Sequence, residues 1–497
     1  MPVTVLRPAA VAALVLAIAT LFPASASAGP TATTALALSD CTLRPMFGTR
    51  TAEARCGSWS VAEDPSVAGG KRIDLFVAVI PARAKERNKA PDPLFILAGG
   101  PGQSAVDAYF AMQGGFERIL RRRDIVLLDQ RGTGKSNRMQ CGFGDSQAEY
   151  DPKATARLTR ECMAQLPGNP ALYTTSLAID DLDAVRAALG YGQVNLYGGS
   201  YGTRVALSYL KYHAATTRAV IIDAVIPQDL ALGPGVPVQS QAALERVVAA
   251  CAADAGCKAA YPTLAADFAA VRAKLKQGRV TVAMRDPVDG KPIELKMSYA
   301  EMAGAVRLML YSPESQSLLP LFLRQAAGGD WVPLAAQVAL SLRQTTELLA
   351  LGMHNSVVCT EDAPFYKDDP VERAAIGRSY LGGIADAAIA EMCLLWPRGP
   401  IKDGFKEPVA SAKPVLLLSG ELDPITPPEY AAHAAKTLSN SRHIVAPGQA
   451  HTVLARGCIP KLAAEFLDSA DPKALDPACV QTLQAAPFFV RFTGPEP

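Results

Sequence analysis

The chain has 497 residues, of which 49% are hydrophobic and 19% are charged, and its formal net charge is only +2. This length exceeds one simple hydrophobic core, so we expect two structural units, one of which can be an insertion in the other. The balanced charge, with no basic stripe among aromatic residues, gives no indication of nucleic-acid binding.

The first 28 residues have the pattern of a secretory signal peptide. Arg7 precedes an apolar run from Ala9 to Phe22, and Ala26-Ser27-Ala28 is a small-residue cleavage site. The apolar run is shorter than the roughly 20 residues that span a bilayer, which favours cleavage over a retained anchor. We therefore expect an exported protein, periplasmic or extracellular, with no membrane attachment after removal of residues 1–28.

Ten cysteines remain after this cleavage, and an even number in an exported chain indicates disulfides. Connectivity cannot be derived from the sequence, and pairing between neighbours is the simplest hypothesis: Cys41–Cys56, Cys141–Cys162, Cys251–Cys257, Cys359–Cys393 and Cys458–Cys479. There is no C-x-x-C spacing, so the sequence gives no support for zinc ligation.

Short apolar strands alternate with helical patterns in the first half of the chain. Residues 29–56 are expected to form a loosely structured lead-in, and Gly69-Gly70 favours a hairpin between the first two strands. The predicted strands are 59–61, 73–80, 94–97, 125–128, 194–197 and 219–222, and the predicted helices are 177–189 and 203–212. This alternation indicates an α/β fold with a mostly parallel sheet.

Helical patterns predominate between residues 227 and 400. They cover 239–255, 264–277, 299–311, 314–327 and 332–351, and a hairpin is expected at 280–284 and 293–297. We interpret this block as a mainly helical lid inserted between core strands. The core therefore has two parts, 29–226 and 401–497, and the second part carries strands at 415–418 and 443–445, a helix at 462–467 and an extended tail.

The motif Gly198-Gly199-Ser200-Tyr201-Gly202 fits G-x-S-x-G between a predicted strand and a predicted helix. That context is typical of a nucleophile elbow, in which a tight turn lifts the serine hydroxyl to the edge of a sheet. Ser200 is the candidate nucleophile, and the backbone N–H of Tyr201 is the candidate oxyanion donor. The alternative interpretation is a structural Gly-Ser turn.

A serine nucleophile needs a base and an acid that orients the base. Among five histidines, His451 is the candidate base because it lies in a loop directly after a predicted strand. Asp423, which follows the strand 415–418, is the candidate acid, with Glu421 as a nearby competitor and Asp362 as a distant one. A turn aspartate is the structural alternative for Asp423.

Two glycine-rich loops follow the strands 94–97 and 125–128. The first, Gly99 to Gly102, is expected to supply the second oxyanion donor, with Gly100 as first choice and Gly99 as second. The second loop, Gly132 to Ser136, looks like the end of a phosphate-binding loop, but Asp129 stands where such a loop needs glycine. We expect a structural turn with a buried network of Asp129 and Arg131.

Taken together, five motifs resemble those of the secreted tripeptidyl aminopeptidases and proline iminopeptidases, which are serine exopeptidases of the α/β-hydrolase fold. The motifs run in the family's order: AGGPG (98–102), DQRGTGKS (129–136), GGSYGT (198–203), ELDPITPP (421–428) and GQAH (448–451). The resemblance, which covers most of the mature chain, implies an α/β-hydrolase whose lid roofs the active site. It implies Ser200, Asp423 and His451 as nucleophile, acid and base, and Gly100 and Tyr201 as the oxyanion hole.

One departure concerns Ala98, because many proline iminopeptidases have histidine there, and this favours the tripeptidyl branch. An exopeptidase also needs an acidic group for the substrate's ammonium. Glu361 is the candidate substrate-binding residue, with Asp362 beside it. A solvated turn or a helix cap is the alternative role for these two carboxylates.

The predicted function is an exported serine aminopeptidase that releases N-terminal residues or tripeptides from peptides with a free N-terminus. No metal, organic cofactor or nucleic-acid partner is implied, and the sequence predicts no oligomeric state. One alternative is an esterase or amidase of the same fold that acts on small molecules. Another is a catalytically inactive hydrolase fold used for binding, which the presence of all three triad residues disfavours.

Overall fold

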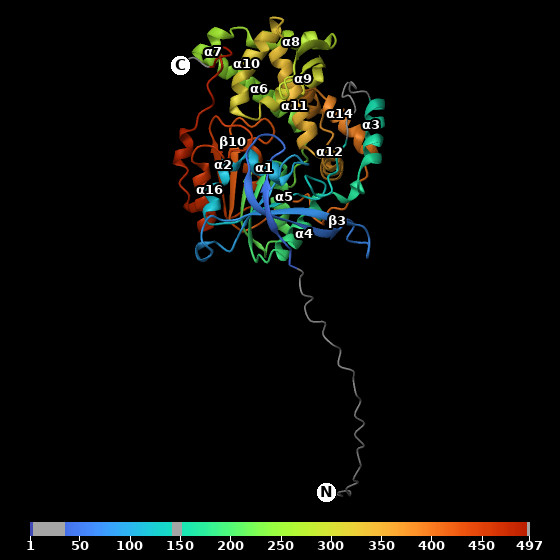
Figure 1. Ribbon diagram of the computed structural model, residues 1–497, viewed down its shortest axis with the longest axis vertical. Coiled ribbons are helices and arrows are strands. Elements are labelled where there is room, and N and C mark those ends of the chain that lie inside the picture. The colour runs from blue at the N-terminus through green and yellow to red at the C-terminus, as the bar shows by residue number, and fades with distance from the viewer. Residues whose placement is uncertain (3–34, 142–151, 495–497) are drawn as a thin grey trace. The chain divides into compact units, whose positions relative to one another are not determined.

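The computed structural model describes residues 1–2, 35–141 and 152–494, so the predicted signal peptide lies outside the described residues apart from its first two. The described residues form a nine-stranded sheet in the order β1-β2-β3-β5-β4-β6-β7-β10-β11 (Figure 1). The first three strands pair antiparallel, and those from β5 to β11 run parallel. The strands are β1 (Ser39–Leu43), β2 (Ala52–Ala62), β3 (Arg72–Ile80), β4 (Leu94–Leu97), β5 (Ile125–Leu128), β6 (Val194–Gly199), β7 (Thr217–Asp223), β10 (Val415–Gly420) and β11 (Ser441–Ala446).

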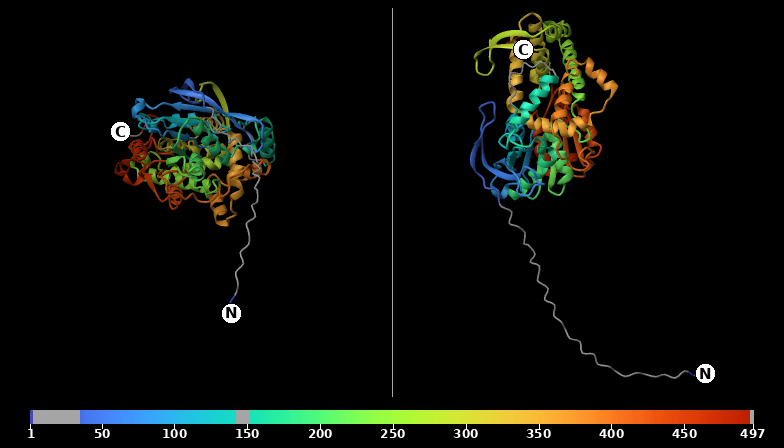
Figure 2. Two further views of the ribbon diagram at one scale, coloured as in Figure 1. Left: turned by 90° about the horizontal axis from the view of Figure 1, so that it is seen from below. Right: turned by 90° about the vertical axis from the view of Figure 1, so that its right-hand side faces the viewer.

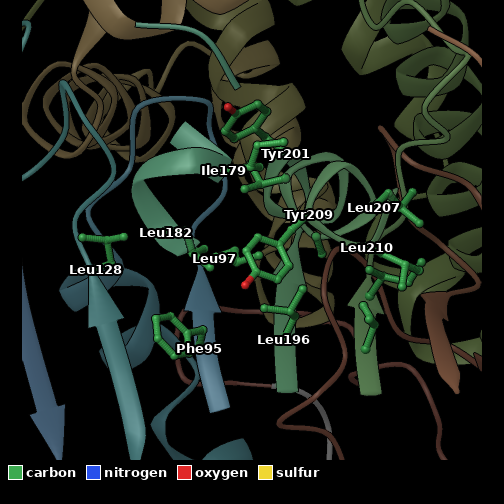
Figure 3. Packing of buried hydrophobic residues seen from close by; sticks show 14 of the residues in the cluster. Phe95, Leu97, Leu128, Ile179, Leu182, Leu196, Tyr201, Leu207, Tyr209 and Leu210 are labelled. Atoms are coloured by element: carbon green, nitrogen blue, oxygen red, sulfur yellow. The ribbon is translucent and has the colours of Figure 1, made fainter. Parts of the chain in front are cut away.

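The parallel strands are apolar on both faces because helices cover both faces of the sheet. Successive side chains of a strand point to opposite faces, so Phe95 and Leu97 of β4 pack in one cluster and Leu94 and Ile96 in the other. Figure 3 shows the first cluster, in which strand residues meet side chains of α4 and α5. The helices before β7 and after β10 are α1 (Ala105–Ala111), α2 (Gln113–Phe116), α3 (Pro152–Gln165), α4 (Thr175–Ala188), α5 (Tyr201–Tyr212), α15 (Pro428–Ala435) and α16 (Ile459–Ser469).

A long, mostly helical segment, which we call the insertion, lies between β7 and β10 and has a hydrophobic core of its own. Figures 1 and 2 show most of these helices gathered beyond one end of the sheet. The segment comprises α6 (Gly235–Ala253), α7 (Ala255–Ala260), α8 (Leu264–Lys276), β8 (Val280–Arg285), β9 (Pro292–Met297), α9 (Tyr299–Met309), α10 (Pro313–Ala327), α11 (Val332–Leu348), α12 (Leu351–Val357), a π-helical turn (Val358–Asp362), α13 (Pro370–Arg378) and α14 (Ile384–Leu395).

Two local expectations were wrong. The segment 29–56 is not a loosely structured lead-in throughout, because β1 pairs antiparallel with β2 from Ser39 opposite Cys56. The helix expected at 332–351 is two helices, since Ala350 donates its N–H to the Gly102 carbonyl at 2.9 Å instead of continuing the helical ladder. The loop between α11 and α12 is therefore attached to the core.

All five predicted disulfides are present. Four of them close loops of 15 to 34 residues, and Cys251–Cys257 closes a loop of 6 residues. No helix among the described residues is both long and apolar enough to cross a membrane.

Candidate active site

Ser200 stands in the turn between β6 and α5, with φ 55° and ψ −123°. A non-glycine residue in this region of backbone conformation is strained and persists only when its surroundings hold it. Here the Ser200 N–H donates to the carbonyl of Asp223 at 2.9 Å, and the Ser200 carbonyl accepts from the Thr203 hydroxyl at 2.6 Å. This is the geometry that a nucleophile elbow requires.

The glycines around Ser200 are required by close backbone approaches. A Cβ on Gly198 would lie 2.2 Å from the Gly202 carbonyl oxygen, and a Cβ on Gly202 would lie 2.1 Å from the Leu97 carbonyl oxygen. A Cβ on Gly99 would lie 3.4 Å from the Ser200 Cβ. The turn and the Gly99–Gly102 loop are thus in contact, as an oxyanion hole built from both would need.

The predicted acid and base are hydrogen-bonded to each other. His451 Nδ1 lies 2.8 Å from Asp423 Oδ2, and the Asp423 side chain is 0% exposed. A carboxylate only accepts hydrogen bonds, so Nδ1 carries the proton and Nε2 remains as the basic nitrogen. The loop after His451 reaches the serine turn, because a Cβ on Gly199 would lie 3.8 Å from Thr452 Cγ2.

Thr426 is a partner of Asp423 that the sequence reasoning did not single out. Its hydroxyl donates to Asp423 Oδ2 at 2.8 Å, and its N–H donates to Oδ1 at 2.9 Å, as does the N–H of Ile425. These donors fix the carboxylate orientation. The spacing Asp-x-x-Thr was a usable signal, since an aspartate readily accepts backbone N–H groups two and three residues onward.

Asp223, at the end of β7, is a second residue that the sequence reasoning missed. Its buried carboxylate accepts the N–H groups of Val453 at 2.9 Å and Leu454 at 2.8 Å, and the Tyr197 hydroxyl at 3.2 Å. Burial raises its pKa to about 6, against the effect of these backbone bonds. Asp223 thus holds the loop after His451 through its side chain and holds Ser200 through its main chain.

The insertion contacts both loops of the site directly. The carbonyl of Tyr311 accepts the N–H of His451 at 3.0 Å, and the two rings pack edge to face with centroids 4.7 Å apart. On the other side, Ala350 donates to Gly102, and His354 Nδ1 lies 3.2 Å from the Pro101 carbonyl oxygen. Burial lowers the pKa of His354, so its ring is neutral at pH 7 and Nδ1 donates to Pro101.

Glu361 and Asp362 are buried in the π-helical turn, so neither forms the solvated turn that was the alternative. Asp362 makes a bidentate ion pair with Arg204 of α5 at 2.8 and 2.9 Å, and it also accepts the N–H of Leu232. Its oxygens are fully engaged by protein donors. Asp362 is therefore a structural partner of Arg204, and its candidacy as a substrate ligand stays a prediction.

Glu361 is joined to the serine turn through Thr175. The Thr175 N–H and hydroxyl donate to the two Glu361 oxygens at 2.7 and 2.8 Å, and the same hydroxyl lies 2.6 Å from the Tyr201 hydroxyl. Burial raises the pKa of Glu361 to about 7, although Arg204 acts in the opposite direction. A substrate ammonium would have to displace Thr175 to reach this carboxylate.

The other candidates have structural partners elsewhere. Glu421 accepts the N–H of Gly448 at 2.8 Å. His213, His433 and His443 bond to Asp180, Asp229 and Ser419 respectively, so none of these histidines is paired with Asp423. Among the described residues, no group of three or more His, Cys, Asp or Glu side chains is arranged to hold a metal ion.

The loop after β5 is a structural turn, as expected. Asp129 is buried and accepts from Ser104 Oγ at 2.8 Å and from the N–H groups of Ala105 and Lys135 at 2.9 Å each. Arg131 is buried in a bidentate pair with Asp181. Each side chain thus serves its own network.

Comparisons with known proteins agree with this geometry. A family model described as alpha/beta hydrolase fold matches residues 92–242, and a model described as TAP-like protein matches residues 382–479. Serine protease Hip1 of Mycobacterium tuberculosis is 25% identical over 461 residues, covering 83% of this chain and 85% of that protein. Carboxylesterase B of the same species is 29% identical over 458 residues, covering 84% and 85%. Tripeptidyl aminopeptidase of Streptomyces coelicolor is 28% identical over 192 residues, covering 35% of each chain.

Proposed function

We propose that this chain, which has the α/β-hydrolase fold and resembles the TAP-like proteins, is an exported serine aminopeptidase. Its substrates are peptides with a free N-terminus, from which it releases single residues or tripeptides. The five disulfides support export, because such bonds persist in oxidising compartments.

In this mechanism Ser200 attacks the scissile carbonyl carbon while His451 Nε2 takes the hydroxyl proton. Asp423 holds the imidazole in the required tautomer and stabilises the imidazolium. The N–H groups of Tyr201 and Gly100 stabilise the oxyanion. His451 then protonates the leaving amine, and water releases the acyl group from Ser200 by the reverse sequence of proton transfers.

The observation that carries the exopeptidase proposal is the direct attachment of the insertion to both sides of the site. Tyr311 covers the His451 loop, and Ala350 and His354 cover the Gly99–Gly102 loop. A site covered on two sides admits a chain end more readily than the middle of a folded polypeptide. This favours an exopeptidase over an endopeptidase.

A second candidate function is an esterase or amidase that acts on small molecules. It is favoured by the 29% identity to a protein named carboxylesterase B. The same serine, base and acid would serve it, and selectivity for a free ammonium would be absent.

The two candidates are separated by incubating the purified protein with matched free and N-acetylated peptides and identifying the products by mass spectrometry, with Ser200→Ala as the blank. The aminopeptidase proposal predicts stepwise loss of one or three residues from free peptides and no cleavage of acetylated ones. Cleavage of both forms at similar rates would refute it, and hydrolysis of aryl esters alone would favour the esterase.

A further inference from the structure

A cavity of about 1280 Å³ lies among α3, α8, α9, α11, α12 and α14. It is separate from the small space behind β4 and β5 and is large enough for several peptide residues. Neither Ser200 nor Glu361 lines it. Its relation to the reaction therefore depends on the residues at its wall.

Two wall residues connect this cavity to the catalytic loops. His354 lines the cavity and bonds through Nδ1 to the carbonyl of Pro101, beside Gly100. Arg307 also lines the cavity and donates to the Tyr311 hydroxyl at 3.0 Å, and the Tyr311 ring packs against His451. The cavity wall is thus linked to the oxyanion loop through His354, and to the base through Arg307 and Tyr311.

The charged side chains that line the cavity are mostly basic: Lys276, Arg279, Arg307 and Arg343 stand against one carboxylate, Glu301. Glu301 is already engaged, because it caps α9 through the Ser298 N–H and lies 3.9 Å from Arg279. Arg343 pairs with Glu347 and also lies 3.8 Å from Asp286. The four basic side chains thus stand against three carboxylates when these partners are included, which leaves a net positive charge.

Arg307 differs from Arg343 in its partners. Within the described residues, its hydrogen bond and its ring contact are both with Tyr311, and it makes no ion pair. The side chain is partly buried. A partly desolvated guanidinium without a carboxylate is costly, and a planar guanidinium binds a carboxylate with two parallel hydrogen bonds.

We propose that this cavity holds the part of the substrate remote from the scissile bond and that Arg307 binds a carboxylate there. The preferred substrates are acidic peptides. The carboxylate can be an Asp or Glu side chain or the C-terminus of a short peptide. This proposal rests on the proposed peptidase function.

The test compares kcat/KM for peptide pairs that differ only in Glu against Gln at a position several residues from the cleaved bond, and for pairs that differ only in a C-terminal acid against an amide. In one of the two kinds of pair, the wild-type protein is expected to have a kcat/KM about tenfold higher for the peptide with the carboxylate than for its amide partner. This ratio corresponds to about 1.4 kcal/mol. Arg307→Gln is expected to reduce that ratio to below about twofold. Arg285→Gln, on the solvent-exposed hairpin of the insertion, is the matched control and keeps the wild-type ratio.

The pair that shows the preference identifies the source of the carboxylate. No preference in the wild-type protein for either pair would overturn the proposal, as would an unchanged ratio in Arg307→Gln. If Arg307→Gln does not fold, Arg307→Lys is used. It should retain a smaller preference for the carboxylate, because lysine keeps the positive charge but cannot form the two parallel hydrogen bonds of a guanidinium.

A failure of the peptidase function has a different signature. The protein would react with a fluorophosphonate but cleave no peptide. The inference is then tested on the mono-4-nitrophenyl ester of a long dicarboxylic acid such as sebacic acid against the corresponding terminal amide, which differ only in the carboxylate remote from the ester. Equal kcat/KM for these two esters would overturn the role of Arg307 independently of peptide cleavage.

Discussion

The carbonyl oxygen of Tyr311 accepts the backbone N–H of His451 at 3.0 Å. Tyr311 follows α9 in the insertion, whereas His451 lies in the core after β11, so this bond joins two parts of the chain that are 140 residues apart. The position of the candidate base therefore depends on the insertion as well as on the sheet. A change in the insertion near Tyr311 is therefore expected to shift His451, as is a change in the core near β11.

Asp223→Asn tests whether this carboxylate positions the His451 loop. The amide has one acceptor oxygen, which can still accept from Val453 and Leu454 at the place of Oδ2, but its NH₂ group then stands at the place of Oδ1, 2.9 Å from the Val453 N–H, where two donors face each other. We expect kcat to fall by about tenfold or more with little change in KM. Asp229→Asn, at the partly exposed partner of His433, is the control. A kcat within twofold of the wild-type value would show that Asp223 is not a positioning residue.

The buried pair of Arg204 and Asp362 attaches the insertion to α5. Removing one partner leaves an uncompensated buried charge, so Arg204→Met should lower the free energy of unfolding by about 3–5 kcal/mol. Arg157→Met breaks an exposed pair with Glu161 and should cost about 0.3–0.5 kcal/mol. Urea unfolding measures both. Equal losses of unfolding free energy in the two variants would contradict the assignment of Arg204 and Asp362 as a stabilising buried pair.

Glu361 makes the stability of the protein depend on pH. Its pKa of about 7 in the folded state lies above its ordinary value of 4.5, so the folded state binds more protons than the unfolded state between these values. The free energy of unfolding therefore falls as pH rises from 4.5 to 7, by about 3 kcal/mol at most. Glu361→Gln removes this dependence and should be the more stable form above pH 7.

The measurement is urea unfolding of both proteins between pH 4 and 8, with Glu314→Gln as a surface control. Parallel curves for the wild-type protein and Glu361→Gln would contradict the prediction. If Glu361→Gln also loses the selectivity for free over N-acetylated peptides, Glu361 contacts the substrate ammonium and its network with Thr175 opens on binding.

Gly202→Ala tests the close packing of the serine turn. The added Cβ would lie 2.1 Å from the Leu97 carbonyl oxygen, and the nearest atoms all belong to the backbone of Leu97 and Ala98, so no flexible side chain can move aside. We expect at least a tenfold slower reaction of Ser200 with a fluorophosphonate. Gly192→Ala, at a position with open space around it, is the control. A normal reaction rate in Gly202→Ala would refute the proposed constraint.

The residues at the carboxyl ends of the strands were predictable because local rules suffice there. A buried strand followed by a glycine turn and a helix places Ser200 without any long-range information. The same holds for the loops that carry Gly100 and Asp423. In the structure β4 and β5 have the predicted bounds, 94–97 and 125–128.

The features that sequence reasoning missed depend on contacts between distant segments. Asp223 is followed by no turn motif, and its partners Val453 and Leu454 are 230 and 231 residues away. The break at Ala350 arises because a core carbonyl takes its N–H. Likewise, the sequence alone cannot tell whether Glu361 and Asp362 bind a substrate or other parts of the protein. Their partners Thr175 and Arg204 are distant in the chain and are known only from the structure.

The most direct test of the account is to react the purified protein with a fluorophosphonate, digest it and locate the adduct by mass spectrometry, with Ser200→Ala and His451→Ala beside it. With Ser200 as nucleophile and His451 as base, we expect one adduct, on the peptide that contains Ser200, absent from Ser200→Ala and formed far more slowly in His451→Ala. An adduct on another residue, or full hydrolytic activity in Ser200→Ala, would contradict the assignment of the nucleophile and with it the mechanism.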